Sequence, residues 1–323
     1  MPHERLDTYF GLPVQQFYRE HLEEDEPPAG SDEPGAYAWR LGDAYEDELD
    51  EDEDGYDFGK LLEGFAGAVD VGSVRALVIG WWGPGWEENT SEAAVKALAA
   101  MAGRMPELRA VFLGEMTSGD SEISWIEHGD VTPLLEAFPR LERLDVRGSS
   151  GLRLRPVRHE ALRTLRFESG GLPGHVVRAV GECELPALEH LELWLGVANY
   201  GGDCSDEDLR GVLAGEGLPA LRHLGLQDSE RQDEIAALAA AAPVVARLES
   251  LSLSMGTLGD EGAEALLSGQ PLTHLARLDL SNHYFSEGMA ERLRAALPGV
   301  ELTMTPGTTY DWNVGGRYVE VSE

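Results

Sequence analysis

The sequence predicts an α/β solenoid, in which short parallel strands form a concave sheet and helices lie on the outside, in the shape of a horseshoe. Three observations predict it: an apolar triad that recurs eight times, helical periodicity after the triads, and turn residues between them. Units of this kind cannot bury their own apolar faces, so they stack and share one core.

The recurring triad has the frame L-x-x-L-x-L and tolerates Val, Ile and Phe. Its first positions are separated by 34, 33, 21, 26, 33, 27 and 27 residues. Alternation of apolar residues indicates a strand with one buried face. The triads are Val74-Leu77-Ile79, Leu108-Val111-Leu113, Leu141-Leu144-Val146, Leu162-Leu165-Phe167, Leu188-Leu191-Leu193, Leu221-Leu224-Leu226, Leu248-Leu251-Leu253 and Leu275-Leu278-Leu280.

A helix is expected after the strand of each repeat. The seventh repeat shows this best: a turn begins at Gly259, the inner stripe of the helix includes Ala263 and Leu266, and Pro271 ends it. In the second repeat Pro133 stands in the first turn of a helix that continues to Phe138.

Additional elements are expected at the two ends of the array, because its apolar core would otherwise be exposed to water there. Residues 36–42 are predicted to form an extra first strand, residues 58–69 its helix, and residues 300–304 a last strand. The predicted organisation is therefore an acidic N-terminal cap (1–70), a repeat array (71–304) and a C-terminal tail (305–323).

The net charge of the 323-residue chain is −34, from 59 acidic and 25 basic residues. Residues 1–60 alone hold 19 acidic and 4 basic residues. The electric field of this negative charge repels phosphate backbones and anionic lipids, so direct binding to nucleic acids or membranes is not expected.

Cysteine usage and the N-terminal segment predict a soluble, cytoplasmic protein. Only Cys183 and Cys204 are present, too few for a disulfide framework. No apolar stretch is long enough to cross a bilayer, and the first residues lack the pattern of a secretion signal. We expect a monomer.

The run LESLSLSMGTLGDEGAEALL at 248–267 resembles the ribonuclease-inhibitor class of leucine-rich repeat. The whole chain, including EISWIEHGDVTPLLEAFPRLERL at 122–144 and LRTLRFESGGLP at 162–173, resembles a group of uncharacterised leucine-rich-repeat proteins of actinomycetes and other bacteria. The resemblance implies the fold and a binding role without a defined partner, since repeat scaffolds bind many unrelated molecules. It implies no catalytic residues.

The residues between the triad positions are expected to point away from the core and to form the binding surface. In the early repeats they are mostly apolar, as at Ala76, Val78, Ala110 and Phe112, and in the late repeats small, as at Ser250. The middle repeats carry the residue types that anchor interfaces. The predicted partner-binding residues are Arg143, Arg147, Arg166, Glu168, His190, Glu192, Trp194 and His223. The alternative is that they only pair charges across neighbouring strands.

His190 and His223 occupy the same slot on adjacent predicted strands, roughly 5 Å apart by strand spacing. With Glu168 or Glu192 they could hold a metal ion that has open coordination positions. A polar patch without metal is the favoured interpretation, because positions on separate strands do not fix ligand geometry, and neither a metal nor a cofactor is predicted.

The segment Asp50–Gly55 matches the first half of a calcium loop, but Leu61 stands where the loop needs a bidentate glutamate. A solvated acidic loop is the favoured interpretation, and such a loop could still bind a cation or a basic partner weakly.

The sequence thus predicts a non-enzymatic scaffold that binds a protein or peptide on the concave face. The alternative is a carrier or substrate protein whose tail, with Gly315-Gly316 before a short terminal peptide, is presented to a modifying enzyme. The alternating residues 318–321 predict a strand that joins a sheet edge or docks on the array.

Overall fold

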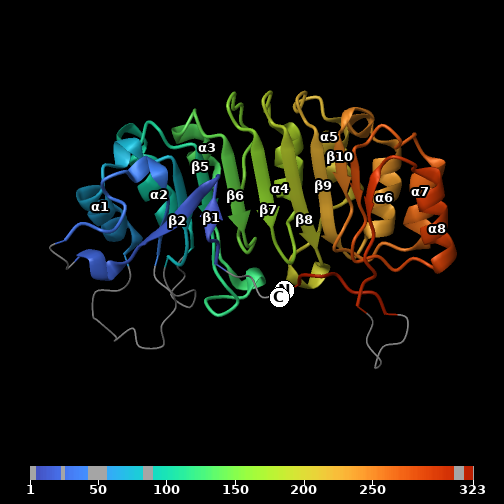
Figure 1. Ribbon diagram of the computed structural model, residues 1–323, viewed down its shortest axis with the longest axis horizontal. Helices are drawn as coiled ribbons and strands as arrows, with labels where there is room; N and C mark the ends of the chain where they lie inside the picture. Colours follow the sequence, from blue (N-terminus) through green and yellow to red (C-terminus); the bar gives the residue numbers. More distant parts are fainter. Residues whose placement is uncertain (1–4, 23–25, 43–56, 83–89, 309–315, 323) are drawn as a thin grey trace. The chain divides into compact units, whose positions relative to one another are not determined.

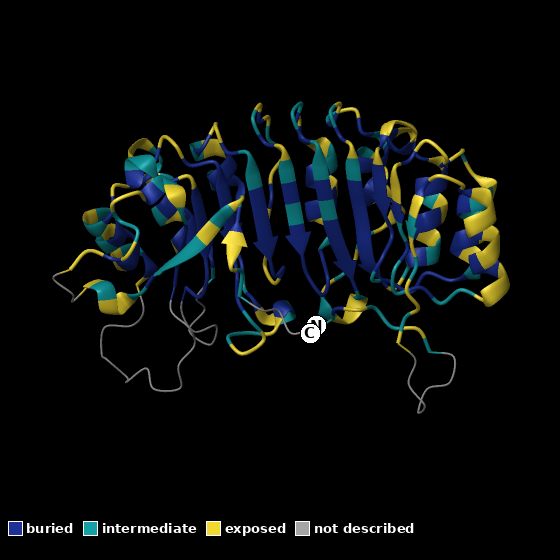
Figure 2. Ribbon diagram, in the orientation of Figure 1, coloured by how far each residue is buried: buried dark blue, intermediate teal, exposed yellow. Residues whose placement is uncertain are grey.

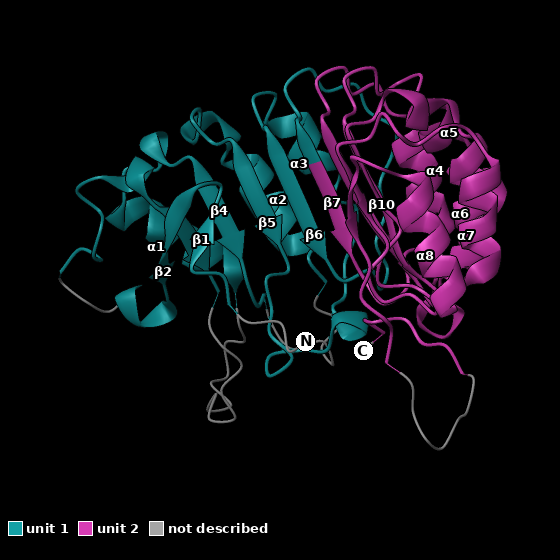
Figure 3. Ribbon diagram, turned by 45° about the vertical axis from the view of Figure 1, so that its right-hand side comes forward, with its two compact units in different colours: residues 1–164 teal, residues 165–323 magenta. Residues whose placement is uncertain are grey.

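The computed structural model describes residues 5–22, 26–42, 57–82, 90–308 and 316–322. The chain divides into two compact units, unit 1 (residues 1–164) and unit 2 (residues 165–323) (Figure 3). Each unit is an α/β structure whose strands follow one another in the sheet in sequence order. The acidic segment 50–55 lies outside the described residues.

Unit 1 has a sheet that is parallel except for its first pair. The strands β2 to β6 pair in parallel, whereas β1 pairs with β2 antiparallel (Figure 1). Its elements are β1 (Thr8–Tyr9), β2 (Leu12–Phe17), β3 (Ala38–Leu41), α1 (Phe58–Ala68), β4 (Ala76–Ile79), α2 (Glu92–Ala100), β5 (Ala110–Leu113), α3 (Thr132–Ala137) and β6 (Arg143–Arg147).

Unit 2 alternates strands and helices, with helices α4 to α8 gathered on one side of the sheet (Figure 3). The pairings from β8 to β12 are parallel. Its elements are β7 (Thr164–Glu168), α4 (Gly174–Glu182), β8 (His190–Gly196), α5 (Asp206–Ala214), β9 (His223–Ser229), α6 (Gln232–Ala241), β10 (Ser250–Ser252), α7 (Asp260–Ser268), β11 (Arg277–Asp279), α8 (Glu287–Ala296) and β12 (Glu301–Thr303).

The second position of a triad lies in register with that of the next strand from β4 to β6 and from β8 to β11. In unit 2 this ladder runs through Leu191, Leu224, Leu251 and Leu278, all at most 1% exposed. Each buried leucine contributes about 1.5–3 kcal/mol through removal from water. Figure 2 shows the resulting buried strands. The one-to-one register confirms the strands predicted from the triads. The helix expected after every strand is wrong for the third repeat, because residues 148–163 between β6 and β7 form no helix.

The predicted end elements are confirmed with slightly different bounds. The predicted strands at 36–42 and 300–304 are β3 and β12, and the predicted helix at 58–69 is α1. The division of the chain into a cap (1–70), a repeat array (71–304) and a tail (305–323) stays a prediction.

Helices α4 and α5 pack closely because each has a glycine at the contact. A Cβ on Gly181 would lie 2.8 Å from the Cα of Gly211, and one on Gly211 would lie 2.7 Å from the carbonyl oxygen of Gly181. Helix α5 begins with a capping box between Ser205 and Asp208, which satisfies two backbone N–H groups. None of the helices in the described part of the chain has the length and apolar run that a bilayer crossing needs.

Residues 6–14 cover one face of the unit 1 sheet, an arrangement that was not predicted. They form a hairpin whose two turn residues, Phe10 and Gly11, have φ of 53° and 72°, as a tight two-residue hairpin turn requires. Tyr9 lies in a buried apolar cluster on the sheet face. The other buried members are Ala38, Ala76, Val78, Ala110 and Phe112, with Leu6, Phe10, Leu12 and Val14 packed against them.

This cluster corrects the expectation for the early repeats. Ala76, Val78, Ala110 and Phe112 were expected to be part of an open binding surface, and they are instead at most 2% exposed. The physical reason is that exposure of an apolar sheet face to water costs free energy, so the chain covers this face with its own apolar N-terminal residues.

The C-terminal tail docks on unit 2 through backbone and side-chain hydrogen bonds. Val321 N–H donates to Asp228 Oδ1 at 2.9 Å, Glu320 N–H donates to the carbonyl of Met255 at 2.7 Å, and Arg317 Nη1 donates to Asp233 Oδ2 at 2.9 Å. Burial raises the pKa of Asp228 well above its usual range despite the bond from Val321. Docking was one of the two predicted outcomes, and residues 316–322 form no strand.

Candidate functional site

The eight predicted partner-binding residues fall into two groups. Arg143 and Arg147 belong to β6 of unit 1. The other six belong to β7, β8 and β9 of unit 2: Arg166, Glu168, His190, Glu192, Trp194 and His223.

The unit 1 pair is engaged by the N-terminal cover. Arg143 Nε lies 2.6 Å from Asp145 Oδ2, and its guanidinium lies over the ring of Tyr9, 5.1 Å from the centroid. Tyr9 Oη donates to the same carboxylate oxygen at 2.8 Å. Burial, followed by the charge of Asp145, raises the pKa of Tyr9, so the phenol keeps the proton that it donates.

Arg147 is only 6% exposed. Its Nη1 donates to the carbonyl of Met116 at 3.0 Å, and its guanidinium lies over the ring of Phe112. The side chain therefore stabilises unit 1 from within, and a partner has little access to it.

The unit 2 residues form a polar cluster that solvent reaches. Arg166 lies between two carboxylates: Nη2 is 2.6 Å from Glu168 Oε1, and Nε is 2.8 Å from Glu192 Oε2. Its guanidinium is 5.4 Å from the centre of the Trp194 ring, within cation–π range. The side chains of Arg166 and Glu192 remain 27% and 18% exposed, whereas Glu168 and Trp194 are buried. We call Arg166, Glu168, His190, Glu192, Trp194 and His223 the unit 2 polar face.

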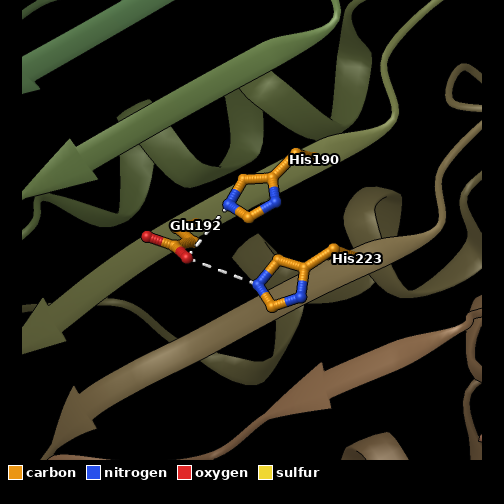
Figure 4. Close-up of side chains that lie close together, drawn as sticks. All are labelled: His190, Glu192 and His223. Carbon is orange, nitrogen blue, oxygen red and sulfur yellow. Dashed lines mark hydrogen bonds and ion pairs between the residues drawn. The ribbon is translucent and has the colours of Figure 1, made fainter. Parts of the chain in front are cut away.

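His190 and His223 are direct partners in the β8–β9 register, and their rings stack at 4.1 Å with 13° between the planes. The Nε2 atoms of both rings approach Glu192 Oε1, at 3.0 Å from His190 and 3.4 Å from His223 (Figure 4). His190 and His223 are therefore adjacent, as expected. Of the two candidate carboxylates, Glu192 contacts both histidines, whereas Glu168 pairs with Arg166.

Gly225 makes room for this arrangement. It pairs with Glu192 across the two strands, and a Cβ at position 225 would lie 3.1 Å from Glu192 Cγ. The carboxylate therefore lies over a position that has no side chain, between His223 and Gln227 on β9.

Burial alone raises the pKa of Glu192, but the hydrogen bonds of His190 and His223 and the charge of Arg166 outweigh burial and hold the pKa well below its usual range. Glu192 is therefore ionised at neutral pH and offers a fixed negative charge on a partly exposed surface.

The late repeats also contribute to this site, which was not predicted. Ser250 Oγ lies 2.7 Å from His223 Nδ1, and Gln227 Nε2 donates to Ser252 and Ser254 at 3.0 and 2.9 Å. The alternating serines 250, 252 and 254 were the available signal, because they place three hydroxyls on one face of a strand.

Ser250, His223 and Glu192 form a chain with the residue types of a catalytic triad. However, Ser250 is 7% exposed and contacts the ring through Nδ1, and the carboxylate faces Nε2 at 3.4 Å. A triad nucleophile must reach its substrate and a general base must be fixed by the third residue. The observed chain is better suited to orient His223.

The fold has a solved relative. A crystal structure of a protein from Bacteroides fragilis, a structural genomics target, is similar to this chain with a TM-score of 0.76 and 26% sequence identity. The similarity covers 88% of this chain and 77% of that protein. No protein-family model matches the sequence, and no curated protein matches it closely enough to be counted as a relative. The comparison supports an α/β repeat-like fold, in agreement with the mostly parallel sheets.

Proposed function

We propose that the chain is a leucine-rich-repeat horseshoe that acts as a non-enzymatic binding scaffold and holds a protein or peptide on the unit 2 polar face. The contrast between the two units carries this proposal. The sheet face of unit 1 is covered by residues 6–14, whereas the side chains of Arg166, His190, Glu192 and His223 remain 18–36% exposed.

The residue types of the unit 2 polar face support recognition of a polar or charged segment. Arginine and histidine donate hydrogen bonds, Glu192 accepts them, and the buried Trp194 supports Arg166 from below. Rigid, mutually bonded side chains lose little conformational entropy when a partner binds, which favours affinity.

The charge of the chain favours a basic partner. A net charge of −34 attracts cationic proteins over long distances and accelerates their association at low salt. It also opposes nucleic acid as the partner, because phosphates would be repelled.

The carrier hypothesis requires the tail to leave its docked position. Residues 317, 320 and 321 hold hydrogen bonds to unit 2, so a modifying enzyme would have to break them before it could reach the tail. No observation favours the carrier hypothesis over the scaffold, and it stays a prediction.

A photo-crosslinking amino acid at position 190 tests the proposed function in lysate of the native host. We expect a crosslinked partner from position 190 and none from position 210, since Arg210 is exposed on α5.

The captured partner is then purified and its affinity for the chain is measured. His190→Ala is expected to weaken binding about tenfold, which corresponds to about 1.4 kcal/mol. Arg210→Ala should leave the affinity unchanged. Equal loss in both variants, or crosslinks from position 210 alone, would contradict the proposal.

A further inference from the structure

Three side chains of the unit 2 polar face direct potential metal ligands to one point. One nitrogen of His190, one of His223 and one carboxylate oxygen of Glu192 lie within 4.8 Å of one another (Figure 4). We propose that this cluster binds a divalent transition-metal ion of the Zn²⁺ type through His190 Nε2, His223 Nε2 and Glu192 Oε1. The proposal does not depend on the scaffold function.

The donor set suits such an ion. Imidazole nitrogen and carboxylate oxygen are the ligands that Zn²⁺ and its neighbours in the first transition row accept, and two histidines with one carboxylate leave coordination positions open. The side chains of His190 and His223 are 36% and 20% exposed. An ion can therefore enter from solvent, and water can fill the open positions.

The surroundings hold the ligands in place. Arg166 Nε binds Glu192 through Oε2, which leaves Oε1 directed at the two rings. Ser250 Oγ binds His223 at Nδ1, the atom that is not needed for coordination. A hydrogen bond to the second ring nitrogen of a histidine ligand is the usual way in which proteins fix its tautomer and orientation.

His223 Nε2 and Glu192 Oε1 lie 3.4 Å apart. A cation between them would contact the imidazole lone pair and the carboxylate oxygen at the same time.

The charge balance permits a dication. Arg166 contributes one positive charge, and Glu168 and Glu192 contribute two negative charges. These three groups sum to a charge of −1, which favours a cation over an anion at the cluster.

The rings need only a limited movement. At 13° they are nearly parallel, and their nitrogens must converge to about 2.0–2.1 Å from a bound ion. Rotation about the Cβ–Cγ bond of histidine is soft, so the rings can converge without a change in the strands.

Titration of the untagged, chelator-treated chain with ZnCl₂ by calorimetry tests the site. No binding partner is present, so the result is independent of the proposed function. We expect one equivalent to bind. His223→Ala and His190→Ala should each weaken binding by at least about 100-fold, and Ser250→Ala by about 10- to 100-fold. Absorption of bound Co²⁺ should report nitrogen ligands in the wild type and be lost in both histidine variants.

His175→Ala is the matched control, because His175 is exposed on α4 of the same unit. It should bind Zn²⁺ as the wild type does, and circular dichroism should show every variant to be folded. The proposal is overturned if the wild type shows no saturable uptake at millimolar Zn²⁺. It is also overturned if the double variant His190→Ala/His223→Ala binds as well as His175→Ala.

Discussion

Replacement of Arg40 by alanine is expected to lower the free energy of unfolding of unit 1 by about 3–5 kcal/mol. Arg40 Nε and Nη2 bind the two carboxylate oxygens of Glu115 at 2.8 and 2.6 Å, and the two side chains are 4% and 1% exposed. Without Arg40, the Glu115 charge stays buried and uncompensated. Urea unfolding at pH 7.5 measures the effect.

The same ion pair anchors the N-terminal cover. Arg40 Nη2 donates to the carbonyl of Leu6 at 3.0 Å, and Leu6 N–H donates to Glu115 Oε1 at 2.7 Å. Arg40→Ala should therefore also expose residues 6–14 to limited proteolysis under conditions in which the wild type resists cleavage.

The control for Arg40→Ala is an exposed ion pair in the same unit. Arg104 Nη1 lies 2.9 Å from Glu63 Oε2, with side chains 48% and 67% exposed. Arg104→Ala should cost less than about 1 kcal/mol, because solvent screens this pair. If both variants lose the same stability, burial does not decide the strength of the Arg40 contact and the explanation is wrong.

Acidification is expected to destabilise unit 1 through His128. Burial lowers the pKa of His128 to about 4 and outweighs the hydrogen bond with the Arg147 carbonyl, which acts in the opposite direction. A group whose pKa is depressed in the folded state contributes stability above its unfolded pKa, about 6.5, and the contribution is lost as the pH falls toward 4. Between pH 7.5 and 4.5 the loss from this group is about 2–3 kcal/mol.

The neutral ring of His128 has both nitrogens engaged, with Nδ1 3.0 Å from Ser91 Oγ and Nε2 2.8 Å from the Arg147 carbonyl. His128→Gln removes the titrating group, so the variant should be less stable at pH 7.5 but lose about 2–3 kcal/mol less than the wild type on going to pH 4.5. His175→Gln should follow the wild type at both values. If the stability of His128→Gln and of the wild type depends on pH in the same way, protonation of His128 does not cause the loss of stability in acid.

The features that could be predicted from the sequence are those that depend on the L-x-x-L-x-L repeat. The triads predicted the strands because buried alternating residues must lie on one face, and the register of Leu191 with Leu224 follows from stacking. The adjacency of His190 and His223 was predictable for the same reason, since equivalent positions of neighbouring repeats pair directly.

The N-terminal cover could not be predicted from the repeat frame. Its contacts join residues more than a hundred positions apart, as between Leu6 and Glu115 or Tyr9 and Asp145. No local pattern at residues 6–14 identifies these partners. The apolar character of Ala76, Val78 and Phe112 was visible in the sequence, and an apolar sheet face of this kind indicates a covering segment better than an open binding surface.

The burial of Trp194, Glu168 and Arg147 also depends on three-dimensional packing. Long side chains on neighbouring strands lie about 5 Å apart and cover one another, so a position directed away from the leucine core can still be inaccessible. Within the unit 2 polar face, Trp194 thus supports Arg166, and substitutions of the more exposed His190 test binding with less damage to the fold.

Thiol reactivity tests most directly the claim that the partner is held on the open face of unit 2. Single cysteines replace His190 or Val78 (His190→Cys, Val78→Cys) in a Cys204→Ser background, where the remaining Cys183 is buried. In the free chain we expect rapid maleimide labelling at position 190 and slow labelling at position 78, which lies under the N-terminal cover. Saturation with the partner should slow labelling at position 190 at least about tenfold. Unchanged labelling at position 190 in the complex, or equal labelling of positions 190 and 78 in the folded free chain, would contradict the account.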